Sequence, residues 1–172
     1  MNAWVHKLGE LKATGDRVAI VTVVGARGSS PCEPGAKMLV TSSDIFGTIG
    51  GGRLEYQCTE LARDLCAPGA NPFIERFPLN ASVGQCCGGV VDVLFDPIPD
   101  GVPDWLRSLI KLRQQHDSSV LCTNLRDASK KFVVTGVTIH PFSAICPDTV
   151  VDRARRNLQA CRAAERTDSW FF

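Results

Sequence analysis

The sequence lacks long apolar runs and has almost no net charge. No stretch approaches the ~18 apolar residues that a membrane-spanning helix needs, and the charged N-terminus MNAWVHKLGELK has no apolar core of a signal peptide. With 19 basic and 18 acidic residues the net charge is +1, which creates no global field for nucleic acid or an anionic membrane. We therefore expect a cytoplasmic protein that binds neither nucleic acid nor membrane.

Histidine is scarce, and no C-x-x-C pattern occurs. The 3 histidines are scattered without the spacing of metal ligands, so a structural zinc site is not expected. The chain of 172 residues has 8 cysteines but no export signal, which favours reduced thiols over disulfides. Four of these thiols have apolar neighbours and are expected to pack as buried hydrophobes: Cys58, Cys66, Cys122 and Cys161.

Strand-like and helix-like patterns are interspersed along the chain. Because 44% of the 172 residues are hydrophobic, the chain can bury a proper core. We expect a single domain, 1–172, of the α/β or α+β class, with a mixed sheet and helices packed on it. Strands are expected at 17–26, 36–41, 45–50, 73–79 and 90–95, followed by a hairpin of 119–125 with 131–139. Helices are expected at 2–13, 53–66 and 99–116, and from about residue 148.

Three glycine-rich segments adjoin these elements: GSSPCEPGAK from Gly28, GTIGGGRLE from Gly47 and GQCCGG from Gly84. Glycine lets the backbone approach a ligand closely, and successive N–H groups form anion-binding nests. The triple glycine leads into a helix, whose first N–H groups and dipole favour an oxyanion. None of the segments matches a nucleotide-binding fingerprint, yet together they favour a phosphate-bearing ligand.

The pair Cys86-Cys87 is the most reactive-looking feature. Adjacent cysteines seldom bridge each other, and a thiol among backbone N–H groups has its thiolate stabilised for binding metal or sulfur. The alternative is two packed cysteines in a tight turn.

Together, GSSPCEPGAKMLV, GTIGGGRLE and GQCCGGVVDVLF resemble the N-terminal domain of the xanthine dehydrogenase accessory proteins, the XdhC/CoxI family. The resemblance covers about residues 18–96 as a motif core, and is weaker over the C-terminal portion, about 97–172. It implies a chaperone that binds a molybdopterin-type molybdenum cofactor while a cysteine desulfurase supplies the sulfido ligand. The chaperone then delivers the cofactor to a xanthine dehydrogenase-like molybdenum hydroxylase. A homodimer is a possible assembly of the chaperone.

The resemblance and the glycine-rich segments give the candidate cofactor-binding residues. Cys87 is the expected metal ligand, because wider relatives keep the cysteine directly before the paired glycines. The full candidate set is Ser29, Ser30, Glu33, Gly35, Lys37, Gly50, Gly51, Gly52, Glu55, Gln85, Cys86, Cys87, Gly88 and Gly89.

The sequence departs from the family pattern in two ways. Cys32 stands where the family usually has a basic residue, which leaves Lys37 as the expected cation. A Rossmann domain commonly follows a segment like DSWFF, whereas this sequence stops at Phe172. Three explanations stay open: a truncated form, a second domain that was lost, or one that another chain supplies.

Two rival interpretations stay open beside the chaperone, which is not itself a catalyst. One is a thiol-dependent transferase with Cys87 as nucleophile and Glu33 or Glu55 as base. The other is a docking or dimerisation module without a ligand.

Overall fold

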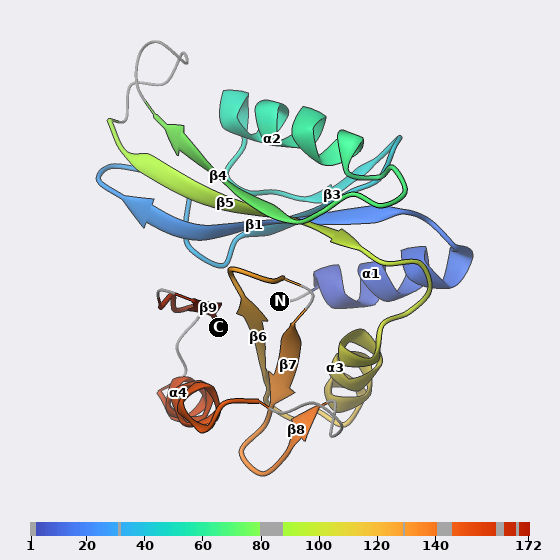
Figure 1. The fold of residues 1–172 in the computed structure, drawn as a ribbon, viewed down its shortest axis with the longest axis vertical. Coiled ribbons are helices and arrows are strands. Elements are labelled where there is room, and N and C mark those ends of the chain that lie inside the picture. Colours follow the sequence, from blue (N-terminus) through green and yellow to red (C-terminus); the bar gives the residue numbers. More distant parts are fainter. Residues whose placement is uncertain are drawn as a thin grey trace. The chain divides into compact units, whose positions relative to one another are not determined.

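The chain folds into two compact units, each with its own sheet. The computed structural model describes residues 3–30, 32–79, 88–128, 130–140, 146–160, 164–167 and 169–172. The units are Met1–Asp100 and Gly101–Phe172 (Figure 1). That the two units behave as one domain stays a prediction.

The mixture of helices and strands confirms the expected class, but the expected mixed sheet is wrong. Between the described strands, every pairing in both sheets is antiparallel. The near-continuous apolar sequence of the first strand suggested a strand buried on both faces, as in parallel sheets. Short links between successive strands impose antiparallel hairpins instead.

The first unit is a five-stranded sheet with two helices, in the strand order β3-β2-β1-β5-β4. Its elements are α1 (Ala3–Thr14), β1 (Val18–Arg27), β2 (Lys37–Val40), β3 (Ile45–Gly47), α2 (Gly52–Asp64), β4 (Phe73–Pro78) and β5 (Val90–Ile98).

Helices cover both faces of this sheet (Figure 1). Alternate residues of β1, including Val21 and Val23, share a core with Leu54 and Cys58 of α2. Because successive side chains of a strand point to opposite faces, the intervening residues face the other side, where α1 contacts β1, β2 and β3. This explains why β1 is apolar throughout although its neighbours are antiparallel.

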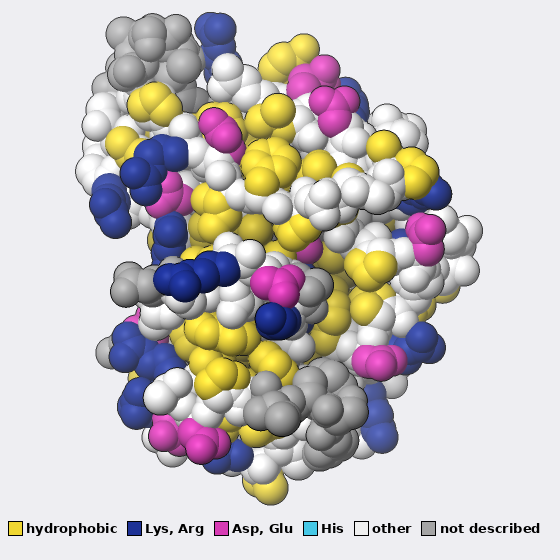
Figure 2. All heavy atoms as spheres, in the orientation of Figure 1, with side chains coloured by type: hydrophobic (Ala, Val, Ile, Leu, Met, Phe, Trp, Pro, Cys, Tyr) yellow, Lys and Arg dark blue, Asp and Glu magenta, His cyan; other side chains and the backbone are white. Residues whose placement is uncertain are grey.

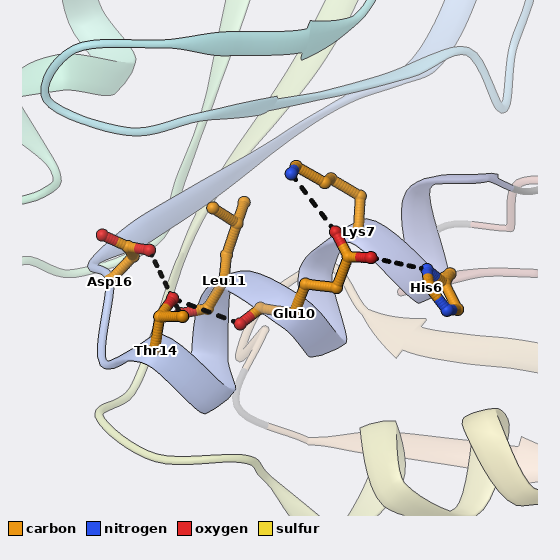
Figure 3. Close-up of polar contacts among 6 residues, drawn as sticks. All are labelled: His6, Lys7, Glu10, Leu11, Thr14 and Asp16. Carbon is orange, nitrogen blue, oxygen red and sulfur yellow. Dashed lines mark hydrogen bonds and ion pairs between the residues drawn. The ribbon is translucent and has the colours of Figure 1, made fainter.

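Helix α1 ends as its sequence predicts. Gly15 has φ of 87°, and Asp16 N–H donates to the Leu11 carbonyl at 2.9 Å, the Schellman arrangement of a helix C-terminus. The Thr14 hydroxyl oxygen lies 2.9 Å from the Leu11 carbonyl oxygen and 2.6 Å from Asp16 Oδ2, so either oxygen can accept its hydrogen (Figure 3). The turn therefore sends the chain directly into β1.

The second unit is a four-stranded sheet in the order β8-β7-β6-β9 with two helices. Its core joins Cys122 and Phe132 of the sheet to Val151 and Ala154 of the last helix, and Phe172 closes it. The elements are α3 (Asp104–Gln114), β6 (Val120–Asn124), β7 (Lys131–Val134), β8 (Ile139–His140), α4 (Asp148–Gln159) and β9 (Trp170–Phe171).

Three local expectations differ from the structure. The segment 131–139 is not one strand, because Thr135 N–H donates to the Thr138 carbonyl and turns the chain between β7 and β8. Leu61 of α2, which the helical spacing from Leu54 and Cys58 predicts to lie on the buried face, is 37% exposed. The short strand β9 has no counterpart among the predicted elements.

The expected burial of four cysteine thiols can be compared with the structure at three of them. Cys58 and Cys122 are fully buried, as expected, whereas Cys66 is only partly buried. Cys161 lies outside the described residues. None of the helices in the described part of the chain is both long and apolar enough to cross a membrane.

Candidate functional site

The described residues of the three glycine-rich segments, which include only Gly88 and Gly89 of the third, lie at one end of the five-stranded sheet. Met38, the second residue of β2, pairs with Gly47, the last residue of β3, while Arg27, the last of β1, pairs with Val90, the first of β5. Each glycine-rich segment therefore enters or leaves the sheet at the same end. In Figure 1 this end lies at the left, where α2 also begins.

The first and third segments are in backbone contact. A Cβ atom built on Gly89 would lie 2.2 Å from the Ser29 carbonyl oxygen and 2.8 Å from that of Arg27. Only glycine permits this approach. Gly88 N–H and the Gly89 carbonyl are bonded to the backbone of Leu79, at 2.7 and 2.8 Å. The glycines of CCGG thus fix the start of β5 against the first segment.

The first segment also packs against α2 through Cys32. This side chain is 4% exposed and shares one core cluster with Ile49, Leu54 and Cys58. Burial, together with the neighbouring Cys32 and Glu55, raises the pKa of Cys58 to about 12. Cys32 therefore has a packing role where the family usually has a basic residue.

The Glu55 carboxylate is hydrogen-bonded to the triple-glycine turn. Its Oε2 atom accepts hydrogen bonds from the Thr48 hydroxyl at 2.5 Å, Ile49 N–H at 2.9 Å and Gly51 N–H at 3.1 Å. Partial burial raises the pKa of Glu55, but these hydrogen bonds outweigh it and hold the pKa below its usual value. Glu55 is therefore an anion at neutral pH.

Positive φ angles explain the glycines of this turn. Gly50, Gly51 and Gly52 have φ of 123°, 77° and 69°, conformations that other residues rarely adopt. Gly50 N–H donates to the Thr48 hydroxyl oxygen at 3.1 Å. The N–H groups of residues 49–51 are thus all used inside the turn.

Lys37 lies on the other face of the sheet. Its neighbours Met38 and Val40 alternate onto the α2 side, as their place in the core cluster shows, so Lys37 faces the α1 side. The half-buried ammonium lies 5.8 Å from the centre of the Trp4 ring, and it donates to the Gly35 carbonyl at 3.3 Å. Burial lowers the pKa of Lys37 to about 8. The structure separates Lys37 from the triple-glycine turn.

The remaining candidates of the first segment are structural or exposed. The Ser30 hydroxyl accepts from Cys32 N–H at 3.1 Å, so it shapes the loop. Gly35 has φ of 96° and donates from its N–H to the Val23 carbonyl at 2.8 Å. Ser29 and Glu33 are exposed at the tip.

Gln85, Cys86 and Cys87 lie outside the described residues. Among the residues that are described, no group of His, Cys, Asp and Glu could hold a metal ion. Burial raises the pKa of the Cys66 thiol and raises that of Cys146 to about 11. With Cys58, these thiols are poor sources of thiolate at neutral pH.

Sequence reasoning missed Arg53, an exposed cation beside the turn. Arg53 is the second residue of α2 and directly follows the triple glycine. The expected cation, Lys37, lies before this turn in the sequence, whereas Arg53 follows it. Figure 2 shows Lys and Arg side chains grouped at the loop end of the five-stranded sheet.

The described residues fit a phosphate-bearing ring system. Among the described residues, nothing lies within 4 Å of the position that a Cβ atom would take on Gly51 or Gly88, which leaves this backbone open to a ligand as far as the described part of the chain is concerned. The exposed hydroxyl of Ser29 and guanidinium of Arg53 offer donors at the same end of the sheet.

The chain is similar to known proteins in part of its sequence and in its fold. No curated protein sequence matches the chain. A solved structure from Bacillus halodurans, described as a xanthine dehydrogenase, shares the fold with a TM-score of 0.62 and 20% sequence identity. The alignment covers 78% of this chain but only 43% of that one. The sequence model of the XdhC and CoxI family matches residues 11–78, which hold the first two glycine-rich segments.

Proposed function

We propose that this protein is a molybdenum-cofactor chaperone. It holds a molybdopterin-type cofactor during sulfuration in the cytoplasm and delivers it to a xanthine dehydrogenase-like molybdenum hydroxylase. The observation that carries the proposal is the convergence of three glycine-rich segments at one end of one sheet. The family match over residues 11–78 supports it, because this family is linked to xanthine dehydrogenase maturation.

The chain's own residues have distinct roles in this proposal. Exposed backbone at Gly51 and Gly88 lets the flat ring system approach closely. Ser29 and Arg53 provide donors for the phosphate. Cys87 is the proposed thiol ligand, with Cys86 and Gln85 beside it. The bound cofactor would supply a molybdenum centre able to accept a sulfido group from a cysteine desulfurase.

The first experiment is expression in a molybdopterin-competent host. The purified protein should release a fluorescent oxidised pterin and molybdenum together. If the protein carries neither pterin nor molybdenum, even after anaerobic incubation with the cofactor, the chaperone proposal is wrong.

Paired cysteine variants then test the thiol and separate the chaperone from the transferase. Cys87→Ser should lose molybdenum without a change in thermal midpoint, because serine fits the same small site. Cys86→Ser is the matched control and should lose much less. If Cys87→Ser keeps the metal but abolishes turnover of a thiol-dependent substrate, the transferase is the better description. If Cys87→Ser loses stability but binds as much molybdenum per folded molecule as wild type, Cys87 has a packing role only.

A further inference from the structure

The triple-glycine turn already holds an anion, the carboxylate of Glu55. Oε2 of Glu55 accepts from Thr48, Ile49 and Gly51, and the Thr48 hydroxyl in turn accepts from Gly50 N–H. An external phosphate that entered this nest would find its donors taken. It would also lie beside a carboxylate whose pKa is held below its usual value.

Like charges at such short range repel strongly in a partly buried site. The N–H groups of this turn, which would otherwise attract an oxyanion, are therefore already occupied by the Glu55 carboxylate. Thr48 and Glu55 are seven residues apart in sequence, and their hydrogen bond ties the turn to the first turn of α2.

Glu55 also has acceptor capacity left over. Its Oε2 atom makes all three of the hydrogen bonds above, and Oε1 accepts none from the residues that the structure describes. An ionised carboxylate can accept at both oxygens. A ligand group with N–H donors is chemically matched to it, and a phosphate is not.

We propose that Glu55 is a specificity-determining residue of the cofactor site. It excludes oxyanions from the 48–51 turn and selects a ligand edge that carries N–H donors, such as the amino-pyrimidinone edge of a pterin. The phosphate of the same ligand is bound outside the turn. This inference rests on the proposed function for the identity of the ligand, but not for the exclusion of oxyanions.

Two probes distinguish this role from a structural one. The first is inorganic phosphate, and the second is 6-hydroxymethylpterin, which is uncharged and carries the N–H edge. Binding is followed on the amide signals of Ile49 and Gly51 by NMR in wild-type protein, Glu55→Gln and Glu60→Gln. Glu60 is exposed on the same helix and ion-paired with Arg63, so its variant removes equal charge away from the turn.

The expected responses to the two probes have opposite signs. Glu55→Gln should show saturable phosphate shifts of Ile49 and Gly51 that wild type does not show at the same phosphate concentrations, because a repelling charge is gone. The same variant should bind the pterin about ten-fold more weakly, because a charge-assisted acceptor is lost. Glu60→Gln should match wild type with both probes.

Three results would overturn the inference. Weaker binding of both probes by Glu55→Gln would show a merely structural role. Unchanged phosphate binding would show that the carboxylate excludes nothing, and saturable shifts of Ile49 and Gly51 by phosphate in wild type would show that the nest is open. Because the phosphate measurement needs no cofactor, it is independent of pterin release from the purified protein, which tests the proposed function itself.

Discussion

Lys37 and Trp4 face each other on the side of the sheet away from α2, with the Lys37 ammonium 5.8 Å from the centre of the indole ring. Trp4 belongs to α1 and Lys37 begins β2, so the pair joins the first helix to the start of the first hairpin. The burial that accompanies this contact lowers the pKa of Lys37 to about 8.

Stability should therefore depend on the protonation of Lys37. Between pH 8 and 10.5 the unfolded chain holds a proton on this group that the folded chain has released. The free energy of unfolding of wild type should thus rise with pH in this window relative to Lys37→Met. Urea unfolding across the window measures the difference. Lys7→Met, which removes an ammonium lying 4.5 Å from the Phe46 ring, is the control. Parallel pH profiles for wild type and Lys37→Met would contradict the shift.

Cofactor binding should depend more on Arg53 than on Lys37. Arg53 follows the triple glycine at the start of α2, whereas Lys37 faces the opposite side of the sheet. Arg53→Met should weaken binding of the cofactor by about 1.5–3 kcal/mol, the range for a hydrogen bond to a charged group. Lys37→Met should weaken it less, as judged by equilibrium binding to both folded variants. A larger loss of binding in Lys37→Met than in Arg53→Met would show that Lys37 contacts the phosphate.

Gly89 should tolerate no side chain. A Cβ atom there meets the Ser29 carbonyl oxygen at 2.2 Å, which is backbone and cannot move aside cheaply. Gly89→Ala should therefore cost at least about 1–3 kcal/mol of stability, as over-packing does, and should also impair cofactor retention. Gly136→Ala is the matched control, because nothing lies within 4 Å of its Cβ position. Equal thermal midpoints for the two variants would show that the first and third segments are not in contact.

Local patterns were enough to predict most elements of the fold. The apolar and β-branched sequence of β1 and the stripe of Leu54 and Cys58 on α2 follow from burial alone. The short strand β8 was missed because a turn that starts at Thr135 interrupts the apolar run. The short strand β9 was missed because it pairs Trp170 with Asn124, which is far away in the sequence.

The candidate site was predicted as a set of segments but not as an arrangement. Glycine spacing indicated that three segments act together, and strand register brings them to one end of the sheet. The face on which Lys37 lies depends on the parity of β2, which no local pattern fixes. The hydrogen bonds of Glu55 Oε2 within the turn could not be predicted, because the sequence does not show that this carboxylate bonds the turn.

Cys32 should not accept a basic residue, although the family usually has one there. The side chain is 4% exposed within the core between the first segment and α2. Cys32→Arg would bury an uncompensated charge and should cost about 3–5 kcal/mol. Ser29→Arg adds the same charge at an exposed position of the same loop and should change stability by no more than about 0.5 kcal/mol. A Cys32→Arg protein as stable as wild type, with tighter cofactor binding, would show that this position faces the ligand after all.

Asn157 is a buried polar residue on the apolar stripe of α4, and its removal should stabilise the second unit. It is 3% exposed, one turn beyond Ala154, and its Nδ2 atom is buried without a hydrogen-bond partner among the described residues. Leaving a donor unsatisfied costs about 1–3 kcal/mol, more than the small cavity that alanine would leave. Asn157→Ala should therefore raise the free energy of unfolding by about 1 kcal/mol beyond the gain from Gln159→Ala, which reports helix propensity at an exposed site of the same helix. Urea unfolding of both variants makes the comparison, and a net loss in Asn157→Ala would mean that the amide has a partner in solution.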